Sequence, residues 1–189
     1  MKKRIFLVLL ALLMLALVGC KGRAETIEAS YTRADGTSET VTMKLASNTD
    51  IVLYSLYVPE DWVVIDQSAS TMAYVSEENK SSISVAQWNL TSEITSIDTW
   101  WNNFHKKENS ESFPSFTILE EGKETTLDGR EAKNYTYTVA FDGMTYKYNV
   151  TASIDQGSIH VITYTSTEEL YDETLEVVQG LILPNFKLK

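Results

Sequence analysis

Apolar and polar residues alternate most regularly between positions 134 and 154. The stretches 134–141 and 144–154 both have a period of two, the pattern of strands that pack one face and expose the other to water. Between them lies Asp142-Gly143, a dipeptide suited to the positive φ angles at both central positions of a type I′ turn. The pattern predicts a β-hairpin, with Thr136, Thr138, Thr145 and Thr151 on its wet outer face.

Further strands follow from the same kind of evidence. Asp35-Gly36 and Asp128-Gly129 also lie between alternating runs and predict two more hairpins. The runs 51–58 and 159–164 are apolar on both faces, which favours more central strands. Weaker strands are expected at 26–33, 39–45, 62–65, 71–75, 82–88 and 115–120.

Two segments have helical periodicity instead. The first places apolar side chains at i, i+3, i+4 and i+7, with Ser96 or Thr95 as a cap; these side chains are Ile97, Trp100, Trp101 and Phe104. The second is expected to begin at Ser166, because Ser166-Thr167-Glu168-Glu169 has capping-box spacing, and its apolar stripe runs to Ile182. Gly180 would weaken its last turn. An antiparallel sheet with two helices is an α+β domain.

The first 20 residues differ from the rest of the chain. Lys2-Lys3-Arg4 precedes an apolar run of 14 residues, too short to cross a bilayer as a helix. The run ends in Leu17-Val18-Gly19-Cys20, which resembles the bacterial lipobox. Cys20 is the only cysteine, and we expect its thiol to carry a diacylglyceryl group with fatty-acyl chains such as palmitate. The alternatives are an uncleaved anchor helix and a plain secretory leader with an incidental cysteine.

A lipid on Cys20 would hold the protein at the extracytoplasmic side of the cell membrane. Two or more acyl chains give an effectively permanent anchor, since each buried methylene contributes about 0.8 kcal/mol. About five residues would separate the lipid from a first strand near Glu25, a span of at most ~18 Å. The expected organisation is a signal peptide at 1–20, a tether and hairpin at 21–46, and the main domain at 47–189.

Composition narrows the class of partner. After the leader, 13 basic and 26 acidic residues give a net charge of −13, which disfavours nucleic acid and predicts that the domain faces away from anionic headgroups. The 169 remaining residues are one domain's length. A single cysteine excludes an internal disulfide framework and a multi-cysteine metal site.

Four segments in order resemble PsbP-like and DcrB-like domains. They are Val58-Pro59-Glu60-Asp61-Trp62, Asn79 with Ser82-Ile83-Ser84-Val85, Leu127-Asp128-Gly129-Arg130-Glu131-Ala132, and 159–165 with the helix after it. The similarity covers roughly 50–186 and leaves out 24–46; Asp61 stands where glycine is common in the family. It implies an α-β-α sandwich on a curved antiparallel sheet, and a protein that binds a protein partner. No partner-binding or metal residue of the family maps onto this chain.

The residues give little sign of catalysis. His105 is interpreted as a solvated helix histidine and His160 as a partly buried sheet histidine, because neither has a second ligand at metal-binding spacing. No nucleophile-elbow, zinc-protease or phosphate-loop motif is present. We therefore expect no catalytic residue, no cofactor and no metal, and interpret the acidic clusters as solvated surface.

Trp100-Trp101 admits two interpretations. The spacing with Ile97 and Phe104 favours a core stripe, but side chains about 100° apart on a helix need not both be covered, so one could form a partner surface. The favoured function is a lipid-anchored, non-catalytic accessory or interaction module for another envelope protein. The alternative is a small-ligand or cation-binding lipoprotein with an aromatic pocket near Trp62 or Trp101. An envelope hydrolase using His105 or His160 is a third hypothesis.

Overall fold

The structure, a computed structural model, describes residues 25–65 and 70–189. The leader, with its lipobox and Cys20, lies outside these residues. Within the two described ranges, no helix combines the length and the apolar character needed to cross a bilayer.

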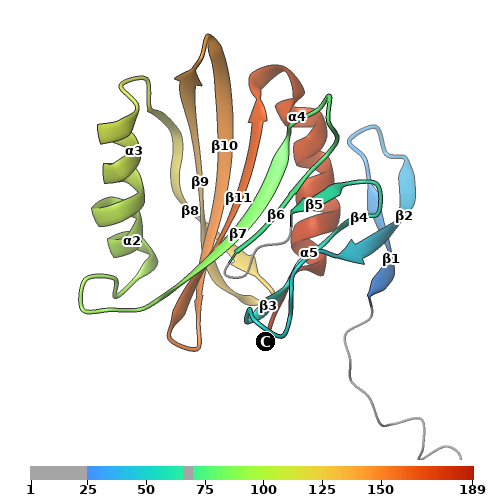
Figure 1. The fold of residues 1–189 in the computed structure, drawn as a ribbon, viewed down its shortest axis with the longest axis horizontal. Coiled ribbons are helices and arrows are strands. Elements are labelled where there is room, and N and C mark those ends of the chain that lie inside the picture. Colours follow the sequence, from blue (N-terminus) through green and yellow to red (C-terminus); the bar gives the residue numbers. More distant parts are fainter. Residues whose placement is uncertain (1–24, 66–69) are drawn as a thin grey trace, which may run out of the picture.

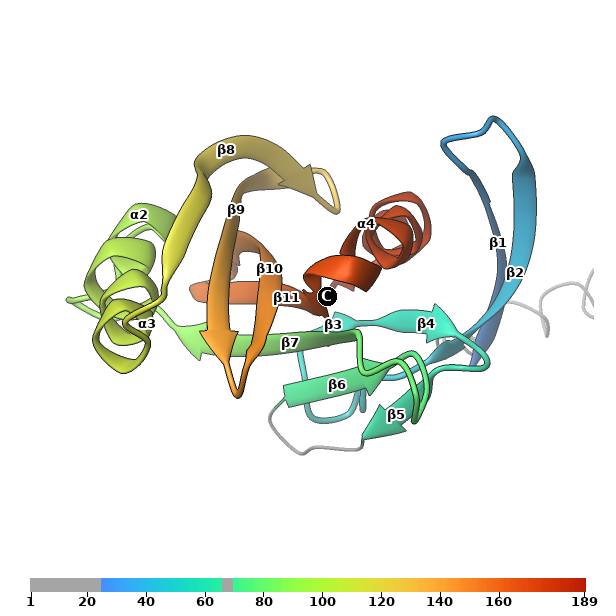
Figure 2. The ribbon, with the colours of Figure 1, turned by 90° about the horizontal axis from the view of Figure 1, so that it is seen from above.

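The centre of the molecule is a seven-stranded antiparallel sheet in the order β5-β6-β7-β11-β10-β9-β8. Figure 2 shows β8 and β9 curling out of the plane of the other strands toward helix α4. The strands are β5 (Val63–Ile65), β6 (Ser70–Tyr74), β7 (Ser82–Asn89), β8 (Thr117–Leu127), β9 (Arg130–Phe141), β10 (Met144–Asp155) and β11 (Ser158–Thr167).

Two small sheets complete the β structure. One joins β1 (Thr26–Thr32), β2 (Ser38–Leu45) and β4 (Tyr57–Pro59); the other pairs β3 (Tyr54–Ser55) with β12 (Lys187–Leu188). The single strand predicted at 51–58 is therefore wrong, because β3 and β4 belong to different sheets. The break lies at Leu56, whose N–H donates to Ser47 Oγ at 3.0 Å and whose carbonyl accepts from Ala46 N–H at 2.8 Å.

The first helical segment is longer than its periodicity indicated. It comprises α2 (Ile97–Trp100), the π-helical turn η1 (Trp101–His105) and α3 (Lys106–Ser112). Ser96 is the N-cap of α2: its Oγ accepts from Thr99 N–H at 3.1 Å, and Thr99 Oγ1 accepts from Ser96 N–H at 2.9 Å. This reciprocal capping box fixes where the segment begins.

The second helical segment comprises α4 (Glu168–Val177), the π-helical turn η2 (Val178–Ile182) and α5 (Leu183–Asn185). The capping box predicted at Ser166 is wrong. Ser166 is still in β11, and its hydroxyl lies 2.7 Å from Ser81 Oγ. Thr167 takes the N-cap position without a side-chain hydrogen bond.

The two helical segments cover opposite faces of the large sheet, which confirms the predicted α+β class with one helix layer on each side (Figure 1). Alternate residues of each strand serve the two cores. Ile159 and Val161 of β11 pack toward α2, whereas Ile162 and Tyr164 pack toward α4. The β1–β2 hairpin joins the core on the α4 side of the sheet through Tyr31. A Cβ at Gly180 would lie 3.0 Å from the Tyr31 ring. Gly180 therefore allows the hairpin to approach η2 closely.

The hairpin turns differ in the φ angles of their two central residues. Asp128-Gly129 and Asp142-Gly143 have positive φ at both positions, as a type I′ turn requires, so these two predicted hairpins are confirmed. Gln156-Gly157 forms an equivalent turn that was not predicted. At Asp35-Gly36 the hairpin forms, but only the glycine has positive φ, and Arg33 N–H donates to Thr37 O across a wider loop.

Candidate functional site

Trp100 and Trp101 are 4% and 1% exposed, so the predicted partner surface is wrong and the core-stripe interpretation holds. The Trp101 ring stacks on Tyr135 at 4.0 Å, and its Nε1–H donates to Glu121 Oε1 at 2.6 Å. Trp100 lies between Trp101 and Trp88, at 6.3 and 6.2 Å. Because Trp100 has aromatic neighbours on both sides, both tryptophan rings are buried, although their side chains lie about 100° apart on the helix.

His105 is half-buried and His160 is buried. His105 Nε2 lies 3.0 Å from Tyr137 Oη beneath Trp100 and Trp101, and burial lowers its pKa to about 4. The solvated helix histidine predicted here is wrong, because the π-helical turn adds a residue and rotates His105 toward the sheet. His160 is buried with Nδ1 unpartnered, and burial lowers its pKa. In the described part of the chain neither histidine lies within ion-pair distance of a carboxylate.

His105 makes the stability depend on pH. The unfolded chain takes up this proton near pH 6.5, but the folded chain does so only near pH 4, so acid favours unfolding between these values. We expect the free energy of unfolding to fall by up to roughly 3 kcal/mol as pH drops through this window, at about 1.36 kcal/mol per pKa unit. Urea denaturation at pH 7, 5.5 and 4 measures this. His105→Gln, which keeps a partner for Tyr137, should flatten the dependence; an equal slope in both proteins would contradict the assignment.

A concavity lies on the other face of the large sheet. A cavity of about 730 Å³ separates the α4–α5 segment from the concave side of β8, β9 and β10. Its volume is within the range of small-molecule sites, but its lining is mainly polar. The aromatic pocket predicted near Trp62 or Trp101 is not what the structure shows, since both rings are buried in the cores.

The floor of the cavity is a closed amide pair. Asn134 on β9 and Asn149 on β10 donate to each other's Oδ1 at 2.9 and 2.8 Å. Their second N–H groups donate to Thr151 Oγ1 at 2.9 Å and to Thr136 Oγ1 at 3.2 Å. All four amide protons are thus used, and both threonine hydroxyls accept, which leaves their own protons available to donate.

Tyr171 of α4 lines the same floor. It is 1% exposed, and its hydroxyl has no hydrogen bond of acceptable geometry, although Thr136 and Asn149 are close enough to influence its pKa. Burial raises the pKa of this hydroxyl well above its ordinary value, so it stays a neutral donor. The Lys147 ammonium covers the ring at 4.1 Å from its centre and reaches the exposed Asp172 at 3.8 Å.

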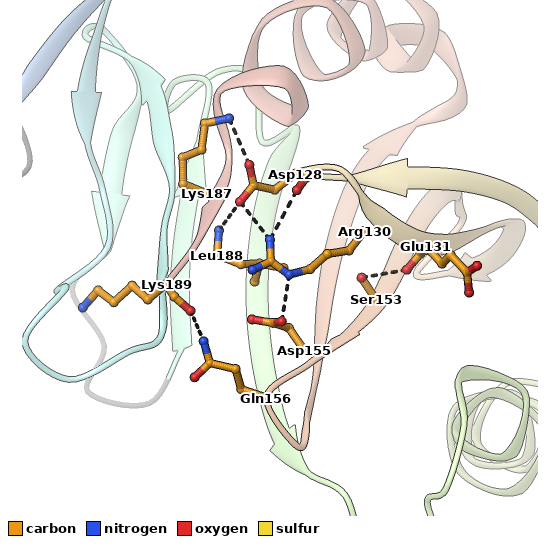
Figure 3. Close-up of polar contacts among 9 residues, drawn as sticks. All are labelled: Asp128, Arg130, Glu131, Ser153, Asp155, Gln156, Lys187, Leu188 and Lys189. Atoms are coloured by element: carbon orange, nitrogen blue, oxygen red, sulfur yellow. Dashed lines mark hydrogen bonds and ion pairs between the residues drawn. The ribbon is translucent and has the colours of Figure 1, made fainter.

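Asp128 and Lys187, which line the cavity, belong to an ionic cluster at the β8–β9 turn (Figure 3). Asp128, in the β8–β9 turn, accepts from Leu188 N–H at 2.9 Å, from Lys187 Nζ at 3.1 Å and from Arg130 at 3.2 Å. Arg130 also donates to Asp155 at 2.8 Å. Burial alone would raise the Asp128 pKa, but these donors hold it below its ordinary value. The cluster ties β12 to the β8–β9 turn.

A second exposed feature is the tip of the β9–β10 hairpin. Phe141 and Met144 pair across the Asp142-Gly143 turn and are 62% and 46% exposed. Their place in the alternation predicted a packed face, but the strands extend beyond the helix that covers that face. Sequence periodicity contains no information on where a covering element ends.

Comparison with known proteins concerns the fold. No family model and no curated protein matches the chain. It is similar to the solution structure of PsbP from the cyanobacterium Synechocystis, with a TM-score of 0.57, 14% identity, and coverage of 92% of this chain and 99% of that one. The fold is PsbP-like.

Two further solved structures are similar to this chain over most of their length. LpqN of Mycobacterium tuberculosis, which is involved in cell envelope biogenesis, has a TM-score of 0.52 and 16% identity over 88% of this chain and 92% of that one. The Ran-binding protein Mog1p of Saccharomyces cerevisiae has a TM-score of 0.51 and 10% identity, over 86% of this chain and 96% of that one. The PsbP-like architecture implied by the sequence motifs is confirmed.

Proposed function

We propose that this chain is a lipid-anchored, extracytoplasmic, non-catalytic accessory protein that binds another envelope protein. The lipobox at Cys20 supports the anchor. The PsbP-like fold supports a binding role, since neighbours with this architecture include a protein of cell envelope biogenesis and a Ran-binding protein. Fold alone does not carry function, so the proposal depends on a surface of this chain.

The observation that carries the proposal is the apolar hairpin tip. Phe141 and Met144 are among the most exposed large apolar side chains of the described residues. In Figure 1 the β9–β10 turn lies at the end of the large sheet opposite the start of β1, where the tether to Cys20 joins. With the anchor proposed at Cys20, the tip would lie at the end of the domain opposite the attachment point. Covering a large apolar side chain contributes up to about 1.5–3 kcal/mol, and such residues are common anchors of protein interfaces.

The experiment is crosslinking and affinity capture from intact membranes. Phe141→Ser with Met144→Ser should reduce recovery of the partner at least about tenfold, the change expected for loss of 1.4 kcal/mol or more. Ile51→Ser is the matched control, because Ile51 is also highly exposed but lies outside the tip. Equal recovery by the tip variant, or no specific partner from intact membranes, would overturn the proposal.

The polar cavity favours the small-ligand alternative as a second candidate function. It is a formed space with hydrogen-bonding groups on its floor. For a cation there is no such support: residues 25–65 and 70–189 contain no group of three or more metal-ligating side chains.

A further inference from the structure

The cavity beneath α4 has unused hydrogen-bonding groups of one kind. The Tyr171 hydroxyl is buried with no hydrogen bond of acceptable geometry, and the Thr136 and Thr151 hydroxyls each accept from an asparagine amide and keep their own proton. Beside them, Asn134 Oδ1 and Asn149 Oδ1 each accept one hydrogen bond and keep a second lone pair. The floor therefore offers neutral donors next to neutral acceptors. A buried donor without a partner is costly, which points to an occupant that supplies one.

The charges of the lining oppose an ionic ligand. Four carboxylates and three lysines line the cavity. Each lysine already has an acidic partner: Lys123 with Glu120 at 3.2 Å, Lys147 with Asp172 at 3.8 Å and Lys187 with Asp128 at 3.1 Å. A phosphate or other polyanion would meet more negative than positive charge. A neutral ligand meets no such penalty.

The two walls differ in character. The sheet side carries the amide and threonine hydroxyl groups, whereas the helix side adds the Tyr171 hydroxyl and the apolar side chains of Leu175, Leu183 and Pro184. A pyranose ring matches this division, because its hydroxyls both donate and accept while its C–H face is apolar. The size of the cavity accommodates a small saccharide. We propose that the cavity binds a neutral saccharide of one or two rings, with the hydroxyls on the Asn134–Asn149 floor and the C–H face against Leu175 and Leu183.

Lys147 covers the ring of Tyr171 beside the cavity. The ammonium lies over the Tyr171 ring, and its carboxylate partner Asp172 is largely exposed at 3.8 Å. An ion pair of this kind contributes little to stability. The lysine side chain can therefore move as a ligand enters, and a ligand hydroxyl that accepts from Tyr171 would supply its missing partner.

The test is glycan-array binding followed by calorimetric titration with the neutral disaccharide that binds best. It uses the full chain in a detergent without a sugar head group. Tyr171→Phe removes only the unpartnered hydroxyl and should weaken binding about tenfold with unchanged melting temperature. Tyr135→Phe is the matched control, since Tyr135 Oη is also buried and unpartnered but belongs to the core beneath α2. The saccharide affinity of this variant should stay within about twofold of the wild type.

A second pair of variants covers the sheet side. Thr136→Val should also weaken binding about tenfold, whereas Thr138→Val, on the same strand and face but outside the cavity, should not. Array binding to no neutral glycan, binding to acidic glycans only, or equal affinity in all four variants would overturn the proposal. Phe141→Ser should leave saccharide binding intact, so the outcome is separable from that of the hairpin-tip experiment.

Discussion

Trp101→Ala is expected to lower the free energy of unfolding by about 3–5 kcal/mol, the range for truncation of a large buried aromatic side chain. The ring is 1% exposed, stacks on Tyr135 and donates to Glu121. Its removal leaves a void between α2 and β9 and takes a hydrogen bond from Glu121. Because a domain of this size has a total stability of about 5–15 kcal/mol, the loss should shift the urea midpoint strongly.

Trp88→Ala is the matched control. Trp88 is 44% exposed and contacts the same cluster through Trp100, so its truncation should cost far less, about 1 kcal/mol. Urea denaturation followed by circular dichroism compares the two variants with the wild type. If Trp101→Ala were as stable as the wild type, the ring would not belong to the core, and the partner-surface interpretation would return.

Local signals were sufficient to predict the hairpins. In β9 and β10 the period of two agrees with the chemistry of the Asp142-Gly143 turn, and both conclusions depend only on residues close together in sequence. The same is true of Ser96, whose capping partner Thr99 is three residues away. Where a local signal competes with a distant partner it fails, as at Ser166, whose hydroxyl is hydrogen-bonded to Ser81, directly before β7.

The cavity could not be predicted from periodicity. Alternation correctly places Thr136 and Thr151 on one face of the hairpin, but it does not show that α4, which follows in the chain, covers part of that face. Thr151 is buried, whereas the sequence interpretation expected a wet surface. One signal was available: Asn134 and Asn149 are poor strand formers in the middle of strands, which indicates a hydrogen-bonded role. Their mutual pairing depends on strand register, which requires the structure.

The π-helical turn at 101–105 is a second feature that the hydrophobic periodicity could not predict. A regular helix would place Phe104 at i+7 on the stripe of Ile97, and the prediction assumed this geometry. The extra residue of the turn instead brings His105 under the tryptophans, within 3.0 Å of Tyr137 Oη. The titration expected for His105 therefore follows from an irregularity that the hydrophobic period does not encode.

Cys20→Ser should release the protein from the membrane. If two or more acyl chains on the Cys20 sulfur hold it, their loss removes nearly all of the binding free energy, because the apolar run before Cys20 is too short to span the bilayer. The −13 charge of the mature chain also opposes adhesion to anionic lipid. We expect at least a tenfold fall in the fraction that sediments with carbonate-washed membranes.

Lys21→Ser is the control for this experiment, since it alters the neighbouring residue and keeps the thiol. Intact mass of the extracted wild type should show the acyl groups and the loss of residues 1–19, and both signatures should be missing in Cys20→Ser. A variant that sediments as firmly as the wild type with the same processing would remove the anchor. The hairpin tip at the far end of the sheet would then have no fixed orientation to the membrane, and the reason to expect its partner on the extracytoplasmic side would be lost.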